Sequence, residues 1–169
     1  MKTYPKIALF SVLLILLGLT ACIKEQQYPL EPVIAFRQYG VVRDVSNYDS
    51  LVVLTISYTD GDGDIGLYDS DTVEPYKYNF YLTFLQMKNG QLTPLIPADS
   101  SLGFNARIPI LTPPGRNKNI KGDISIDIQL TYARFLLQSD TIAFDVYIKD
   151  RALHQSNVVR TPIFLISKP

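Results

Sequence analysis

The chain is poor in the residues that usually build disulfides and zinc sites, and it lacks tryptophan although it has eleven tyrosines. Its 169 residues include one cysteine, Cys22, one histidine, His154, and no tryptophan. A single cysteine excludes an internal disulfide, and a single histidine without a further cysteine excludes a multi-histidine zinc site. The absence of tryptophan also weakens a carbohydrate-binding interpretation, because its large ring is a common stacking surface.

Two motifs of catalysis and nucleotide binding are also missing. No Gly-x-Ser-x-Gly segment is present to supply a nucleophilic serine for His154, and a lone loop histidine is more often exposed or capping. No glycine-rich phosphate loop precedes a predicted helix. We therefore expect the protein not to be an enzyme and not to bind nucleotides.

The first residues have the pattern of a signal peptide. Lys2 and Lys6 precede an apolar run of thirteen residues, 7–19, which is shorter than the roughly 20 residues needed to span a bilayer. The run ends in Leu19-Thr20-Ala21-Cys22, a small-residue exit typical of signal-peptide cleavage. We therefore predict that residues 1–21 are a signal peptide. The alternative, a transmembrane anchor with an incidental cysteine, is disfavoured by the length of the run.

The Leu-Thr-Ala-Cys ending resembles the lipobox of bacterial lipoproteins. That resemblance implies that Cys22 becomes the acylated N-terminus and that its lipid attaches the chain to a membrane, since each buried methylene adds about 0.8 kcal/mol. Residues 22–32 are then the acylated cysteine and a short spacer. Without Lys2 and Lys6, fourteen basic residues face sixteen acidic ones, a formal charge of −2, so no nucleic-acid partner is expected.

Residues 33–169 show the two-residue alternation of β-strands. The alternation is clear in ranges 51–58, 78–84, 123–131 and 141–149, and looser in 33–42, 104–110 and 158–166. Asn89-Gly90 predicts a type I′ hairpin turn, which adds a short strand at 91–96. Pro109 and Pro162 place their strands at sheet edges or bulges. Only residues 132–138 are compatible with a helical turn.

Seven to eight short strands without strand–helix alternation favour one all-β domain, 33–169, with the fold of an immunoglobulin-like antiparallel β-sandwich. A closed barrel is the main alternative. In immunoglobulin order, the strand at 51–58 is strand B and the strand at 141–149 is strand F. The loops that follow strands B and F open at the same pole.

An acidic, glycine-rich segment follows the strand at 51–58. Asp60, Asp62 and Asp64 occupy alternate positions, and Asp71 stands twelfth, where a calcium loop places its last carboxylate. We predict a structural Ca²⁺ site from this spacing. The segment departs from the helix–loop–helix motif, because its glycine is seventh, its twelfth residue is Asp, and strands flank it. The alternative is a solvated turn, although three close carboxylates repel one another without a cation.

A second polar segment, 150–157, follows the strand at 141–149 and is expected at the same pole. Asp150, or the amide oxygen of Asn157, is a candidate to complete the cation shell. Arg151 is a candidate to pair instead with a loop carboxylate, and a plain turn with a buried Asp–Arg bridge is equally open. Tyr81 and Tyr147 are expected to point outward; cross-strand packing is favoured over a ligand platform.

Residues 58–67 (YTDGDGDIGL) and 148–157 (IKDRALHQSN), together with the lipobox, resemble a family of uncharacterised lipoproteins of Bacteroidota. The resemblance implies a class and an envelope location, but no activity. Lys24-Glu25 is similar to the short charged signal that sends some lipoproteins of that phylum to the cell surface. Both orientations on the outer membrane, the periplasmic face and the cell surface, remain open.

These observations predict a lipid-anchored, non-catalytic binding or interaction module with an unidentified protein or glycan partner. The main alternative is a carbohydrate-binding accessory lipoprotein of an uptake system. A third hypothesis, a hydrolase that uses the acidic loop, has less support.

Overall fold

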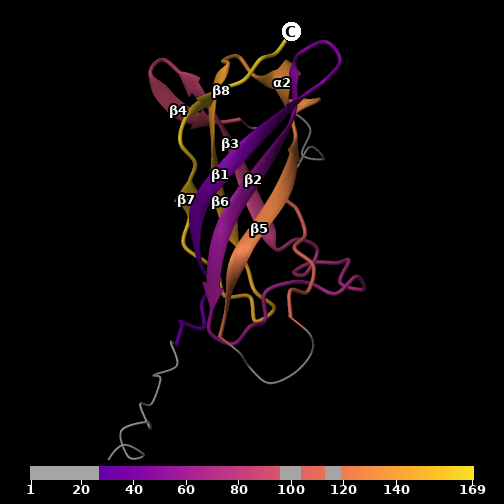
Figure 1. Ribbon diagram of the computed structural model, residues 1–169, viewed down its shortest axis with the longest axis vertical. Helices are drawn as coiled ribbons and strands as arrows, with labels where there is room; N and C mark the ends of the chain where they lie inside the picture. Colours follow the sequence, from indigo (N-terminus) through magenta and orange to yellow (C-terminus); the bar gives the residue numbers. More distant parts are fainter. Residues whose placement is uncertain (1–26, 96–103, 113–118) are drawn as a thin grey trace, which may run out of the picture.

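Most of the strands form where the alternation predicts them. The computed structural model describes residues 27–95, 104–112 and 119–169, so the predicted signal peptide and Cys22 lie outside the described residues. The elements, shown in Figure 1, are β1 (Val33–Arg43), β2 (Asp49–Asp60), β3 (Phe80–Lys88), β4 (Gln91–Pro94), β5 (Ile120–Gln129), α2 (Ala133–Leu136), β6 (Thr141–Ile148), β7 (Val159–Arg160) and β8 (Phe164–Leu165).

The strands build two antiparallel sheets. One has the order β1-β2-β5, and the other has the order β4-β3-β6-β7, with β8 also paired to β6. In immunoglobulin lettering these are A-B-E and C′-C-F-G, so β2 is strand B and β6 is strand F. The prediction of an all-β, immunoglobulin-like sandwich is confirmed.

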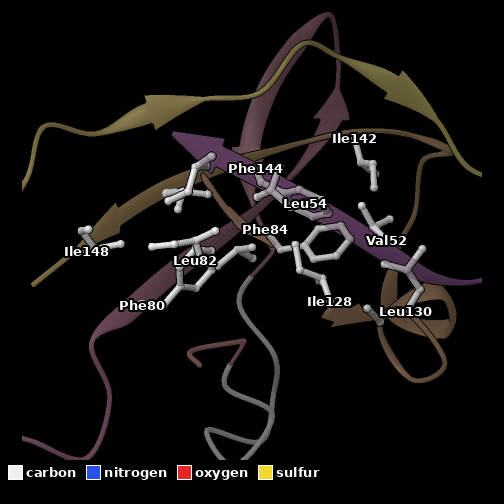
Figure 2. Close-up of a cluster of buried hydrophobic side chains, with 14 of the residues drawn as sticks. Val52, Leu54, Phe80, Leu82, Phe84, Ile128, Leu130, Ile142, Phe144 and Ile148 are labelled. Carbon is white, nitrogen blue, oxygen red and sulfur yellow. The ribbon is translucent and has the colours of Figure 1, made fainter. Parts of the chain in front are cut away.

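The core lies between the two sheets, where the inward side chains of facing strands interdigitate (Figure 2). The predicted inward side chains of β2, β3, β5 and β6 are buried, except that Tyr58 and Ile126 are half-buried, and some positions between them, such as Thr55, Leu85 and Ala143, are buried as well. Among the largest fully buried side chains are those of Phe80, Phe84, Phe144, Leu54, Ile56 and Ile148. Edge-to-face contact between Phe84 and Phe144, with ring centroids 4.8 Å apart, joins β3 to β6.

The hairpin turn and the helical turn also form as predicted. Asn89 and Gly90 have φ values of 51° and 78°, the positive values at both central positions that a type I′ turn requires. Residues 133–136 form one turn, α2, and none of the described helical residues belong to a segment long and apolar enough to cross a membrane.

Two strand predictions need correction. Residues 104–110 form isolated bridges rather than a strand, because the side chain of Asn79 takes both backbone groups of Ile108: it accepts from the N–H at 2.6 Å and donates to the carbonyl at 3.1 Å. The strand expected at 158–166 is split into β7 and β8, with Pro162, which has no N–H to donate, between them.

The two ends of the sandwich differ. The start of the described chain and the segments after β2 and β6 gather at the lower end of Figure 1. We call this end the loop pole, comprising residues 27–32, 60–67 and 149–158. The turn between β1 and β2, α2 and the C-terminus lie at the opposite end, which we call the α2 pole, comprising residues 44–48, 130–140 and 166–169.

Candidate metal centre

Three carboxylates from two loops converge at the loop pole. Asp60 is the last residue of β2, Asp64 follows four residues later, and Asp150 follows β6. Their ligand oxygens all lie within 4.8 Å of one another. Because β2 and β6 belong to different sheets, the cluster joins the two layers of the sandwich. The predicted meeting of Asp150 with the acidic loop is therefore observed.

Backbone N–H groups fix the three carboxylates in place. Asp60 Oδ2 accepts from the Asp64 N–H at 3.0 Å, and Asp64 Oδ2 accepts from the Ala152 N–H at 3.0 Å. Asp150 Oδ1 accepts from the His154 N–H at 2.8 Å. Each carboxylate thus receives one main-chain hydrogen bond, which sets its orientation.

Several oxygens of this loop have no hydrogen-bond partner although they are buried. They are the Oδ1 atoms of Asp60, Asp62 and Asp64. Asp60 has an exposed fraction of 0%, so its carboxyl is shielded from bulk water, whereas Asp62 and Asp64 are half-buried. A buried oxygen without a partner costs about 1–3 kcal/mol or more when charged, and either a proton or a bound cation removes this cost.

The electrostatics agree with the geometry. Burial, followed by the charges of Asp62 and Asp64, raises the pKa of Asp60 to about 7. Burial, followed by the charges of Asp150 and Asp62, raises the pKa of Asp64 to about 6. Burial also raises the pKa of Asp150, against the lowering effect of its hydrogen bonds from His154. Near neutral pH the cluster therefore exchanges protons readily, and a bound cation would displace them.

The donor set suits a hard cation. All the converging side-chain ligands are carboxylate oxygens, which Ca²⁺ prefers, and Ca²⁺ takes six to eight oxygens in flexible geometry. Asp62, also predicted as a ligand, does not belong to the cluster of three, but its charge raises the pKa of Asp60 and of Asp64, and its Oδ1 is buried and unpartnered. His154 Nδ1 lies 2.9 Å from Asp150 Oδ2, so the imidazole holds a candidate ligand from outside.

Glycines allow the loop to pack this tightly. Gly66 has a φ of +115°, and a Cβ there would lie 2.4 Å from the Pro109 carbonyl oxygen. At Gly61 a Cβ would lie 2.4 Å from the backbone oxygen of Tyr28 and 2.6 Å from that of Pro29. The acidic loop is therefore packed against the chain segment that leads back toward Cys22.

The structure does not bring Asp71 into the cluster. Its Oδ2 accepts from the Tyr68 N–H at 2.8 Å, and its carbonyl accepts from Arg107. Arg107 also donates to the carbonyls of Tyr68, Tyr76 and Lys77, so this one guanidinium holds residues 68–77 together. The twelfth-position analogy with calcium loops gave Asp71 a role that this turn does not allow.

Two other candidates in the 150–157 segment have different roles. The Asn157 side chain accepts from the Ile34 N–H at 2.8 Å and donates to the Ile34 carbonyl at 2.9 Å, so it fastens the segment to β1. The Arg151 N–H donates to the Asp64 carbonyl at 3.4 Å, and its guanidinium lies over the Tyr68 ring. The contact between Asp150 and His154 was not predicted; their i, i+4 spacing was the available signal.

Two other surfaces of the described residues are weaker candidates for a binding site. Tyr81 and Tyr147 stack on each other with centroids 4.7 Å apart and an interplanar angle of 6°, so the rings cover one another, as the cross-strand interpretation predicts. A shallow hollow of about 500 Å³ lies on the β1-β2-β5 sheet. It is lined in part by Arg37 and Asp123, which form an ion pair at 3.4 Å, so their charges are already paired with each other.

Comparison of the chain with protein-family models, with curated proteins and with solved structures finds no match.

Proposed function

We propose that this protein is a lipid-anchored, non-catalytic binding or interaction module of the bacterial envelope whose loop pole is ordered by Ca²⁺. The observation that carries the proposal is the cluster of Asp60, Asp64 and Asp150, in which the Oδ1 atoms of Asp60 and Asp64 are buried without a hydrogen-bond partner. A cation at this point ties the loop after β2 to the loop after β6. It also offsets part of the entropy of ordering them, about 1–2 kcal/mol per residue.

The anchor and the location rest on the sequence. The basic start, the short apolar run and the lipobox-like ending at Cys22 favour export and acylation. The non-catalytic assignment is supported by Ser156, which lies near His154 in the chain. Its hydroxyl donates to the Asn157 carbonyl and accepts from the Ile148 N–H, so it is engaged in backbone hydrogen bonds.

Calcium titration by calorimetry tests the metal site. The chain from residue 23 onward, which contains every described residue, is expected to bind one Ca²⁺ at pH 7.5. Asp64→Asn is expected to weaken binding at least tenfold, because it removes a charged ligand while keeping an acceptor for Ala152. Asp71→Asn is the matched control: it removes an acid of the same loop outside the cluster, and binding should stay within about twofold. Equal effects of both changes, or no heat of binding, would refute the site.

Membrane fractionation tests the anchor. Expressed in a bacterial host with its first 21 residues, the wild-type chain is expected in the membrane fraction and Cys22→Ser in the soluble fraction. Equal membrane retention of the two chains would refute acylation at Cys22.

A further inference from the structure

Four exposed apolar side chains lie on segments that form or border the loop pole, and the α2 pole carries exposed apolar side chains as well, such as Val45 and Phe135. The segment that leads to the predicted anchor, the start of β1 and the loop after β6 each contribute. The side chains and their exposed fractions are Leu30 (55%), Val33 (44%), Leu153 (39%) and Val158 (57%). Two contacts bring their segments together: Asn157, the neighbour of Val158, is hydrogen-bonded to Ile34, and Gly61 packs against Tyr28 and Pro29. We call these four side chains the apolar rim.

Leu153 is the most informative member of the apolar rim. It has a φ of +68°, in the left-handed region that Gly or Asn adopts at lower cost, and its N–H donates to the Asp150 carbonyl at 3.2 Å. Bulky residues rarely adopt this strained conformation, and when they do they often lie in binding and switch segments. The turn therefore projects an apolar side chain from the same loop that carries Asp150.

The number of residues between Cys22 and the described domain limits the distance between the proposed lipid anchor and the apolar rim. Five residues separate Cys22 from Tyr28, and a fully extended chain spans at most about 3.6 Å per residue, so Tyr28 stays within roughly 22 Å of Cys22. Tyr28 is fixed to the domain by its N–H, which donates to Asn119 Oδ1 at 2.8 Å. An acyl chain on Cys22 consequently holds the loop pole, rather than the α2 pole, close to the lipid head groups.

The charge of the loop pole opposes such contact unless a cation is present. Glu31, Asp60, Asp62, Asp64 and Asp150 give the loop pole up to five negative charges against the two positive charges of Lys149 and Arg151, a formal charge of −3 with His154 neutral. Anionic head groups repel this surface, and Ca²⁺ neutralises two of its charges on binding.

We propose that the loop pole is a calcium-dependent membrane-docking surface that lays its apolar rim on the phospholipid bilayer to which Cys22 is anchored. The inference rests on the proposed function, since it needs both the acylated Cys22 and the cation. Its occupant is a phospholipid surface, because the length of the tether places that surface within reach of Leu30 and Leu153. The bound domain then stands on its loop pole with a fixed orientation.

The absence of native tryptophan makes a direct test possible. Leu153→Trp and, separately, Leu30→Trp introduce a single reporter in the apolar rim, and Val45→Trp introduces one at the α2 pole, where Val45 is fully exposed. Because Cys22 is the only cysteine, the chain from residue 22 onward is coupled through it to a maleimide-bearing lipid. The vesicles contain phosphatidylethanolamine, phosphatidylglycerol and, in one arm, brominated acyl chains.

With calcium, both reporters in the apolar rim are expected to shift to shorter wavelengths and to lose emission roughly twofold on brominated vesicles, as for side chains at the head-group boundary. With chelator they should behave like Val45→Trp, which should not respond in either condition. Absence of quenching in both rim variants, or quenching that is the same with calcium and chelator, would overturn the proposal. Calorimetry without vesicles separates the two proposals: calcium binding without quenching refutes docking alone, and no calcium binding refutes the metal site itself.

Discussion

Replacing Asp60 by Asn separates two effects of its carboxylate: the loss of stability caused by a buried charge without calcium, and the gain in stability when that charge binds calcium. The change removes the charge of a fully buried carboxyl while keeping its shape and an oxygen that can accept from the Asp64 N–H. In chelator at pH 8, Asp60→Asn is expected to be more stable than the wild-type chain. In calcium at the same pH, the order is expected to reverse, because the variant lacks a charged ligand.

The stability that the wild-type chain loses without calcium follows from the pKa of Asp60, which rises from 3.8 to about 7 in the folded chain. A raised folded-state pKa means that the fold binds this proton more tightly than the unfolded chain does. Its contribution to stability is complete below about pH 3.8 and is lost as the pH rises through about 7. At about 1.4 kcal/mol for each pH unit between the two pKa values, the loss is on the order of 4 kcal/mol, or roughly 8–16 °C in Tm.

Urea denaturation in chelator at pH 5 and pH 8, repeated in millimolar calcium, measures about 2–3 kcal/mol of this loss, because pH 5 already lies above 3.8. The wild-type chain should lose stability between pH 5 and pH 8 in chelator, and Asp60→Asn should lose less. Calcium should restore the wild-type chain and leave the variant nearly unchanged. A variant that is less stable than the wild-type chain in chelator at pH 8 would refute the reasoning, because the carboxylate would then stabilise the fold without a cation.

Three further changes test other parts of the structure. Gly66→Ala is expected to cost at least about 3 kcal/mol, because its Cβ would overlap the Pro109 carbonyl at a φ of +115°, and the midpoint of urea unfolding measures the loss. Asn157→Ala should cost about 2 kcal/mol by leaving the Ile34 N–H and carbonyl without partners, with faster hydrogen exchange of the Ile34 amide; unchanged exchange would contradict the assignment. Arg107→Met should lower stability by about 2–4 kcal/mol in calcium and in chelator alike, since it removes hydrogen bonds to the carbonyls of residues 68–77 but no ligand.

Much of the fold could be predicted because its strands alternate cleanly. In β6, Ile142, Phe144, Val146 and Ile148 are all buried, and the sequence pattern alone places them on one face. The turn at Asn89-Gly90 was predictable because few other dipeptides adopt positive φ at both positions. The convergence of Asp60 and Asp150 followed from immunoglobulin strand order, since strands B and F end at the same pole.

The predictions that failed depend on side-chain hydrogen bonds that no periodicity records. Asn79 satisfies the backbone of Ile108 and so replaces the strand partner that residues 104–110 were expected to have. The role of Asp71 was predicted from spacing and that of Asn157 from the position of its loop, but Asp71 closes a turn at Tyr68 and Asn157 is hydrogen-bonded to Ile34 in β1. Such contacts depend on which loops become neighbours after folding, so local sequence does not specify them.

The opposite placement of the loop pole and the C-terminus gives the molecule a defined reach (Figure 1). Strand β2 has 12 residues, and at about 3.3 Å per residue it spans roughly 40 Å. With the proposed anchor at Cys22, the sandwich acts as a rigid spacer that holds the α2 pole well beyond the lipid head groups. A domain fused after Pro169 would be displayed at that height, while one inserted before Tyr28 would lift the loop pole off the lipid and abolish the orientation.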